Sequence, residues 1–144
     1  DTVLAGESLV AFDVDDLIVG VATCYDIRFP EQFKELASQG AQLIVVPTSW
    51  ADGPGKLEQW RLLTAARALD STSYILAAGQ SRPGGDAEAG NPSGPTGIGH
   101  STIVDPNGVR MAEAGYEDDI LYADIDPNEV AKTRRALPVV ATVD

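Results

Sequence analysis

The only cysteine of this 144-residue chain, Cys24, lies between an apolar β-type run and a polar segment that begins at Pro30. The surrounding residues, Val19 to Glu31, read VGVATCYDIRFPE. A thiol at the turn between a strand and a helix is exposed, and backbone N–H groups and the positive end of the helix dipole favour negative charge beside it. This arrangement suits nucleophilic attack in acyl transfer. The same pattern is also typical of a small, buried cysteine without a chemical role.

His100, the only histidine, offers a second design for a thiol hydrolase, because cysteine and histidine often act together as nucleophile and base. The structural alternative is a hydrogen-bonded residue at the end of a strand near the pocket. The neighbouring GPTGIGHS stretch lacks the lysine of a phosphate-binding loop, so we do not expect nucleotide binding.

The elements that would position Cys24 alternate between strands and helices. Strands are predicted at 9–12, 17–23, 43–47, 74–78, 101–104, 109–114 and 120–125, and helices at 30–40, at 57–71 and from 126 onward. The longest helical pattern places Leu62, Ala65, Ala66 and Leu69 on one face. Alternation of strands and helices predicts parallel strands with crossover helices, and the Gly- and Pro-rich residues 80–99 predict a surface loop that lines or covers a site.

Composition excludes several classes of function. The formal net charge of −12 would repel a nucleic acid backbone, and no apolar run approaches the roughly 18 residues of a membrane span. The acidic clusters at 13–16 and 117–119 lack the spacing of a calcium loop and are expected to be solvated surface. One cysteine cannot form an internal disulfide, and no secretory leader is visible, so we expect a cytoplasmic protein.

Several ordered blocks of sequence resemble the nitrilase superfamily of carbon–nitrogen hydrolases. They are GVATCYDIRFPE, LIVVPTSW, WRLLTAARALDSTSYILAAG, GHSTIVDPNG and ADIDPNEVAKTRRALPV. The form CYDxRFPE is similar to the amidase branch, which includes omega-amidases and deaminated-glutathione amidases. True nitrilases usually carry tryptophan and glutamate at the positions of Tyr25 and Asp26, so the resemblance favours an amide over a nitrile as substrate.

The resemblance implies an α/β fold, a four-layer αββα sandwich that pairs across a two-fold interface, and no metal or organic cofactor. It implies that Cys24 is the catalytic nucleophile, forms a thioester with the acyl group, and is assisted by the backbone N–H of Tyr25 at the oxyanion. Ser49, Trp50 and His100 are expected at the substrate pocket. Trp50 would either form a wall of that pocket or pack in the core.

Three charged residues near the cysteine, Asp26, Arg28 and Glu31, are expected to be structural. Arg28 and Glu31 would tie the helix after Cys24 to its surroundings through ion pairs, and Arg67 and Asp70 would form a similar pair on the longest helix.

The family also requires a general-base glutamate and a lysine, both upstream of the cysteine. Residues 1–23 contain no lysine and a single glutamate, Glu7, while Glu31 and Lys34 follow the cysteine and are expected to be structural. Residues 1–144 therefore resemble the C-terminal portion of one carbon–nitrogen hydrolase domain whose N-terminal portion is absent. Half of a layered sandwich would expose a large apolar sheet face. We expect another chain to supply the missing half, or cleavage or truncation to have removed it.

The leading hypothesis is a hydrolase that converts a small carboxamide to a carboxylic acid and ammonia through Cys24 in the complete protein. The expected partners are a small amide, the missing half, and further copies of the protein in a dimer or higher even-numbered oligomer, with no nucleic acid and no membrane. Alternatives are a catalytically silent fragment that serves assembly or binding, nitrile hydrolysis, and a thiol hydrolase that uses His100.

Overall fold

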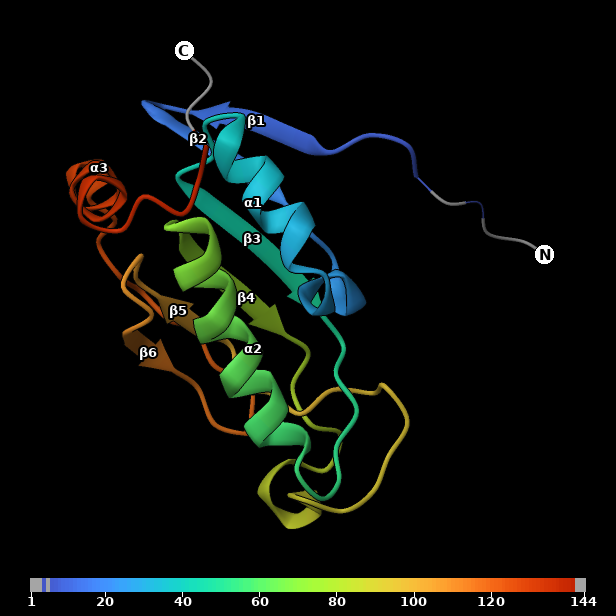
Figure 1. Cartoon of the computed structure of the whole chain (residues 1–144). Helices are drawn as coiled ribbons and strands as arrows, with labels where there is room; N and C mark the ends of the chain where they lie inside the picture. The colour runs from blue at the N-terminus through green and yellow to red at the C-terminus, as the bar shows by residue number, and fades with distance from the viewer. Residues whose placement is uncertain (1–3, 5, 142–144) are drawn as a thin grey trace.

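The computed structural model describes residue 4 and residues 6–141, which form one six-stranded sheet with helices packed against it (Figure 1). The strands are β1 (Val10–Val14), β2 (Leu17–Val21), β3 (Leu43–Thr48), β4 (Tyr74–Gly79), β5 (Thr102–Val104) and β6 (Arg110–Glu113). The helices are α1 (Pro30–Ser38), α2 (Lys56–Ser71) and α3 (Pro127–Ala136), with short 3-10 helices η1 (Cys24–Arg28) and η2 (Gly85–Glu88). The expected α/β class is confirmed.

The strands follow one another across the sheet in chain order. The central strands β2, β3 and β4 are parallel, and β1, β5 and β6 are antiparallel to their neighbours. Parallel neighbours need a crossover connection, which α1 supplies between β2 and β3 and α2 between β3 and β4. The parallel pairing predicted from the alternation of elements is therefore confirmed. The strands predicted at 101–104 and 109–114 form the hairpin of β5 and β6, and in its DPNG turn the Gly108 N–H donates to Asp105 C=O at 2.9 Å.

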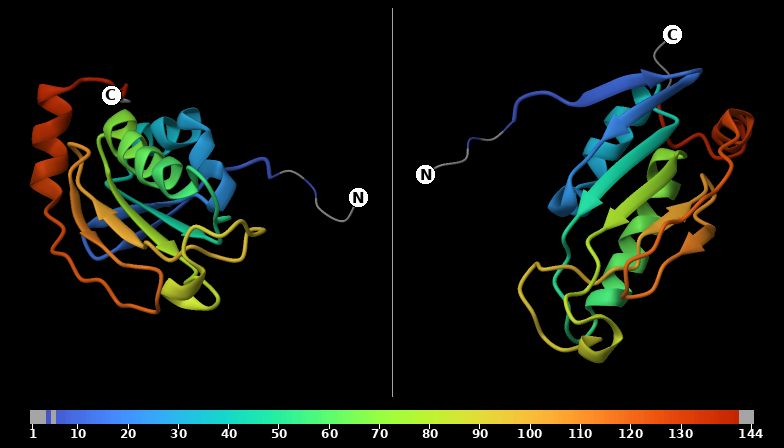
Figure 2. Two further views of the ribbon diagram at one scale, coloured as in Figure 1. Left: turned by 90° about the horizontal axis from the view of Figure 1, so that it is seen from below. Right: turned by 180° about the vertical axis from the view of Figure 1, so that it is seen from behind.

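The main core lies between the sheet and the pair α1 and α2, which lie side by side on one face (Figure 2). Phe33 and Leu36 of α1 and Trp60 of α2 are at most 1% exposed. They pack on sheet residues including Ile44 and Ile75. This face holds β2, β3 and β4 in register, and so fixes where their carboxyl ends lie.

The prediction for the buried face of α2 is wrong. Leu62 is 69% exposed and Leu69 is 41% exposed, whereas the buried residues are Trp60, Thr64, Arg67, Ala68 and Ser71. Thr64 and Ser71 can be buried because their hydroxyls donate to helix carbonyls one turn earlier, at 2.9 and 2.7 Å. The predicted ion pair from Arg67 to Asp70 forms at 2.9 Å, so Arg67 enters the buried stripe with its charge paired.

The opposite face of the sheet is apolar from β1 to β5. Register places the following side chains on it: Val10, Phe12, Val14, Leu17, Val19, Val21, Leu43, Val45, Pro47, Tyr74, Leu76, Ala78 and Ile103. Helix α3 covers its middle, where Val130 packs with Val19, Leu43 and Tyr74. The side chains of β1 remain about half exposed, with Phe12 at 48%.

The predicted strand at 120–125 is also wrong. This segment crosses the apolar sheet face on its way to α3 and joins no strand (Figure 2). Its alternating pattern is real, because Leu121 and Ile125 are half-buried while Ile120 and Tyr122 are 73% and 84% exposed. A chain that lies across a sheet face buries alternate side chains but finds no strand edge for its backbone N–H and C=O groups.

In the described part of the chain, no helix is long and apolar enough to span a membrane.

Candidate active site

The carboxyl ends of the three parallel strands meet at one edge of the sheet. β2 ends at Val21, β3 at Thr48 and β4 at Gly79. Cys24 follows the first end, Ser49 and Trp50 follow the second, and Gln80 follows the third. In open α/β sheets, ligands bind just beyond the carboxyl ends of the parallel strands.

Cys24 adopts a left-handed backbone conformation, with φ of +48°. For a residue with a side chain this costs about 1–2 kcal/mol, and such strain is typical of a nucleophile at a tight strand-to-helix turn. Two bonds close the turn: the Thr23 N–H donates to the Asp26 carboxylate at 2.8 Å, and the Asp26 N–H donates to Thr23 C=O at 3.0 Å. The predicted turn between a strand and a helix at Cys24 is therefore present.

The helix predicted at 30–40 forms as α1, but a short 3-10 helix that was not predicted separates it from the strand before Cys24. Cys24 opens the five-residue helix η1, and α1 begins only at Pro30. Because a helix dipole acts within the first turn, the dipole of α1 does not extend to the thiol. The turn itself, rather than a long helix, positions the sulfur.

A pocket of about 160 Å³ lies beside the thiol. Its described lining residues are Cys24, Tyr25, Arg28, Ser49, Trp50, Ala51, Lys56 and Pro95. The structure thus brings together four of the predicted site residues, Cys24, Tyr25, Ser49 and Trp50. The Cys24 sulfur lies 3.8 Å from Ser49 C=O, so the two loops are in contact at the thiol. Lys56 and Pro95 were not predicted, because nothing in their local sequence marks them as pocket residues.

Trp50 and Arg28 form one wall of this pocket. The Arg28 guanidinium lies 4.7 Å from the centre of the Trp50 ring and 5.4 Å from that of Tyr25. Trp50 is only 6% exposed, packs on Trp60 at 5.4 Å, and donates from Nε1 to Lys56 C=O at 3.2 Å. Trp50 thus packs in the core and also lines this pocket. Within the described chain, Arg28 makes cation–π contacts in place of the expected ion pair.

The acidic residues near Cys24 lie outside its pocket. Asp26 is engaged by Thr23 and, at 3.4 Å, by the Gln32 amide. Glu7 lines a separate hollow with Asp26 and Gln32. Glu31 is exposed on α1. Among the described lining residues of the Cys24 pocket there is no carboxylate.

His100 lies away from the Cys24 pocket, contrary to its expected place there. It is 5% exposed, its Nδ1 is 2.7 Å from Ile98 C=O, and its ring meets the edge of Tyr116 at 4.4 Å between centres. The indole N–H of Trp60 donates to His100 C=O at 2.9 Å. These contacts bury His100 just before β5, next to Trp60. This arrangement matches the structural alternative rather than a cysteine–histidine pair.

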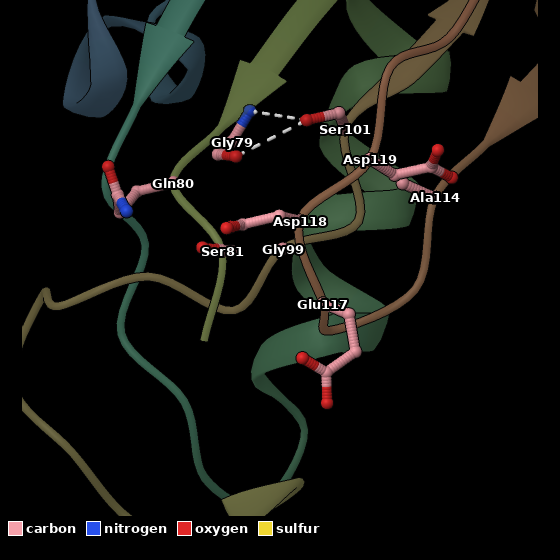
Figure 3. A pocket seen from close by; sticks show the side chains of 9 residues that line it. All are labelled: Gly79, Gln80, Ser81, Gly99, Ser101, Ala114, Glu117, Asp118 and Asp119. Carbon is pink, nitrogen blue, oxygen red and sulfur yellow. Dashed lines mark hydrogen bonds between the residues drawn. The ribbon is translucent and has the colours of Figure 1, made fainter. Parts of the chain in front are cut away.

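Another hollow, of about 270 Å³, lies at the end of β4 (Figure 3). Its lining residues are Gly79, Gln80, Ser81, Gly99, Ser101, Ala114, Glu117, Asp118 and Asp119. Ser101 bridges the end of the strand, accepting from Gly79 N–H at 2.9 Å and donating to Gly79 C=O at 3.3 Å. Glu117 accepts from Asp86 N–H at 3.0 Å. Over the described residues, no group of histidine, cysteine and carboxylate side chains is arranged to hold a metal ion.

Residues 2–135 match the sequence profile of the carbon–nitrogen hydrolase family. The chain belongs to this family. The resemblance to the carbon–nitrogen hydrolases seen in the sequence is therefore confirmed. Among curated relatives, the chain is 50% identical over 142 residues to hydrolase MT0498 of Mycobacterium tuberculosis. The matched region covers 96% of this chain and 50% of the relative. The chain is also 42% identical over 128 residues to the deaminated glutathione amidase of Escherichia coli O157:H7, which covers 89% of this chain and 44% of that enzyme. The chain thus spans about half the length of these relatives.

Solved structures agree on the fold. The crystal structure of Saccharomyces cerevisiae Nit3, a member of branch 10 of the nitrilase superfamily, matches with a TM-score of 0.79 and 34% identity, over 97% of this chain and 49% of Nit3. A mutant of an amidase from Nesterenkonia sp. AN1 matches with a TM-score of 0.70 and 27% identity, over 93% of this chain and 47% of that one. That structure shows the acetamide moiety of fluoroacetamide added covalently at the amidase's active-site cysteine.

Proposed function

We propose that Cys24 is the nucleophile of an enzyme that hydrolyses a small carboxamide to a carboxylic acid and ammonia. The left-handed Cys24 at a strand-to-helix turn, with its thiol in a pocket, carries this proposal in a chain of the carbon–nitrogen hydrolase family. The covalent adduct at the active-site cysteine of the Nesterenkonia amidase supports the same role for a cysteine in a related fold.

The proposed reaction has two steps. The Cys24 thiolate attacks the amide carbonyl carbon, and the tetrahedral intermediate collapses with cleavage of the C–N bond and transfer of a proton to the departing nitrogen, releasing ammonia. Water then attacks the thioester, the C–S bond breaks, and the carboxylic acid leaves while the thiol is restored. The Tyr25 backbone N–H would stabilise the oxyanion in both steps.

The remaining catalytic groups would come from outside the described residues. A general base has to lie within hydrogen-bond reach of the proton that it accepts. The described pocket offers no carboxylate. We therefore propose that a glutamate and a lysine from an N-terminal portion of the complete domain finish the site. That portion would cover the apolar sheet face, where Phe12 and its neighbours on β1 are half exposed.

The charged residues of the pocket support an anionic substrate. Arg28 and Lys56 both line it and both carry positive charge. The relative from Escherichia coli O157:H7 is named for an amide of deaminated glutathione. At about 160 Å³ the pocket is smaller than the roughly 300–1,000 Å³ of typical small-molecule sites, which suits a short acyl chain. We propose an amide that also bears a carboxylate.

Ammonia release by the complete protein tests the proposal. The substrates are neutral primary amides and monoamides of dicarboxylic acids, with wild type, Cys24→Ala and Cys24→Ser compared at equal folded concentration. Both variants should release no ammonia above background, and iodoacetamide should modify Cys24 in the native wild type in parallel with the loss of activity. Turnover by Cys24→Ala at the wild-type rate would exclude the proposed nucleophile.

The charge of Arg28 has its own test. Arg28→Met should raise the KM for monoamides of dicarboxylic acids about tenfold to a hundredfold, which corresponds to the loss of one charge-assisted hydrogen bond. Neutral amides should change much less. Lys34→Met, on the exposed side of α1, is the matched control and should leave both KM values unchanged. Equal losses on both kinds of amide in Arg28→Met would contradict an anion-binding role.

A second candidate is a catalytically silent domain that serves assembly. The half-exposed apolar strand β1 favours it, because such a face needs a partner. Modification of Cys24 by iodoacetamide only after denaturation, together with no ammonia release, would select this candidate.

A further inference from the structure

One side of the Cys24 pocket is formed by a segment far away in sequence, residues 93–97, which we call the rim segment. Pro95 of this segment lines the pocket. The segment is tied to the loop after β3: Ser49 Oγ donates to Pro95 C=O at 2.7 Å, and Gly97 N–H donates to Trp50 C=O at 3.0 Å. Its position is therefore set by hydrogen bonds to the loop that also carries pocket residues.

Asp52 is the centre of this attachment. Its N–H donates to Ser93 Oγ at 3.1 Å, and its C=O accepts from Ser93 N–H at 3.2 Å. Its carboxylate accepts from Gly53 N–H at 2.7 Å and from Gly90 N–H at 2.9 Å, and pairs with Arg82 Nε at 3.3 Å. Asp52 thus joins the loop after β3, the chain after β4 and the approach to the rim segment.

The Asp52 side chain is 1% exposed and that of Arg82 is 7% exposed. Charges so far from water are tolerated only when they are paired and hydrogen-bonded, and removing one partner leaves the other uncompensated. The Asp52–Arg82 ion pair is therefore part of the buried structure. The Asp52 carboxylate holds Arg82 and Gly90, which precede the rim segment, against the loop after β3.

Apart from the Asp52 bonds and those of Pro95 and Gly97 to the loop after β3, few contacts hold the middle of the rim segment. Gly94, Pro95 and Thr96 are exposed, and a side chain added at Gly90 or Gly94 would meet no neighbouring atom within 4 Å. A segment with few buried apolar contacts opens at low free-energy cost when its hydrogen bonds are removed. The wall that Pro95 contributes consequently depends on the Asp52 attachment together with the bonds of Pro95 and Gly97 to the loop after β3.

We propose that Asp52 is a positioning residue that fixes the rim segment so that Pro95 limits the length of the acyl group bound beside Cys24. This inference rests on the proposed amide hydrolysis and adds a determinant of substrate size. Asp52 touches no substrate, because it lies outside the lining of the pocket and acts through Ser93 and Gly90. Pro95 is the specificity-determining residue.

The test compares kcat/KM for long and short amides in the complete protein. Hexanamide is measured against acetamide, and adipamate against succinamate, in wild type, Asp52→Asn and Ser93→Ala. Freeing the rim segment should raise the ratio of long to short about tenfold in Asp52→Asn and about threefold in Ser93→Ala, as expected for loss of a charged and a neutral hydrogen bond. A purely structural role would lower both members of a pair equally and leave the ratio unchanged.

Matched controls separate size selection from general destabilisation. Glu113→Gln breaks another carboxylate–arginine pair, on β6, and Ser38→Ala removes another hydroxyl bonded to backbone, on α1. Both should keep the ratios within twofold of wild type. If Asp52→Asn does not fold, Ser93→Ala decides.

This inference would be overturned if the ratio of long to short amides stayed within twofold of wild type, or fell, in the Asp52 and Ser93 variants. The proposed function would still stand in that case, as long as the wild type hydrolyses these amides. If wild type releases no ammonia from any of the four amides, the proposed function fails and the inference fails with it.

Discussion

The left-handed backbone at Cys24 stores strain, and replacing this residue by glycine should release it. Alanine is the proper reference, since Cys24→Ala and Cys24→Gly both lack the thiol and differ by one methyl group. A side chain at φ of +48° costs about 1–2 kcal/mol that glycine does not incur. Glycine loses about 0.5–1 kcal/mol more backbone entropy on folding than alanine. Cys24→Gly should therefore be about 0.5–1 kcal/mol more stable than Cys24→Ala.

The assay is thermal unfolding followed by circular dichroism, with urea unfolding as a second measurement. For a domain of about 150–250 residues, 1 kcal/mol shifts Tm by about 2–4 °C, so the expected gain is about 1–4 °C. Ala65→Gly is the matched control, because it removes the same methyl group from a half-buried residue in the interior of α2. There the change should lower stability by about 1 kcal/mol. Opposite signs at the two positions would show that the backbone conformation, rather than the methyl group, decides the effect.

A Cys24→Gly protein no more stable than Cys24→Ala would refute this reasoning. It would mean that the turn is not held in its left-handed conformation against a steric cost. The bonds between Thr23 and Asp26 would then close the turn without strain, and the resemblance to a nucleophile elbow would lose its physical basis.

Two further predictions concern the scaffold. Partial burial would raise the pKa of Glu113, but the hydrogen bonds and charge of Arg61 outweigh it and hold this pKa below its usual range. At pH values above about 4.3, the pKa of the unfolded glutamate, the pair should stabilise the fold by about 1 kcal/mol. This stabilisation should be lost as the pH falls through the lower pKa of the folded state. The Tm values of wild type and Glu113→Gln, plotted against pH, should therefore converge near about pH 3. Gly79→Ala would place Cβ 2.5 Å from Gly99 C=O and should cost about 1–3 kcal/mol in urea unfolding, whereas Gly94→Ala, with open space, should be neutral.

Much of the site follows from the sequence because strand ends are readable. The apolar runs that end near Val21 and Thr48 predict parallel strands, and residues just after such ends meet at one edge. This logic correctly brought Cys24, Ser49 and Trp50 together. Lys56 could not be found in this way, since it opens a helix and reaches the pocket through the path of the preceding loop.

The failures share a physical cause: local patterns report burial, not the partner that produces it. On α2, polar Thr64 is buried because its hydroxyl bonds within the helix, and Leu62 is left outside. Alternation at 120–125 reflects a chain lying on a sheet face instead of a strand in the sheet. His100 resembled a pocket residue by its type, but its left-handed backbone, with φ of +53°, and its contact with Ile98 turn it into the core.

The charges beside Cys24 decide what the rest of the protein has to supply. Arg28 and Lys56 are the charged side chains among the described residues that line the pocket, and neither group can accept a proton in its charged form. They suit the binding of an anion, but thiol attack and thioester hydrolysis both need a proton acceptor within about 3 Å. Asp26, the nearest carboxylate along the chain, is already committed to the Thr23 N–H. Under the proposed function, the base must therefore approach the pocket from a segment beyond the described residues, across the loops that carry Cys24 and Ser49.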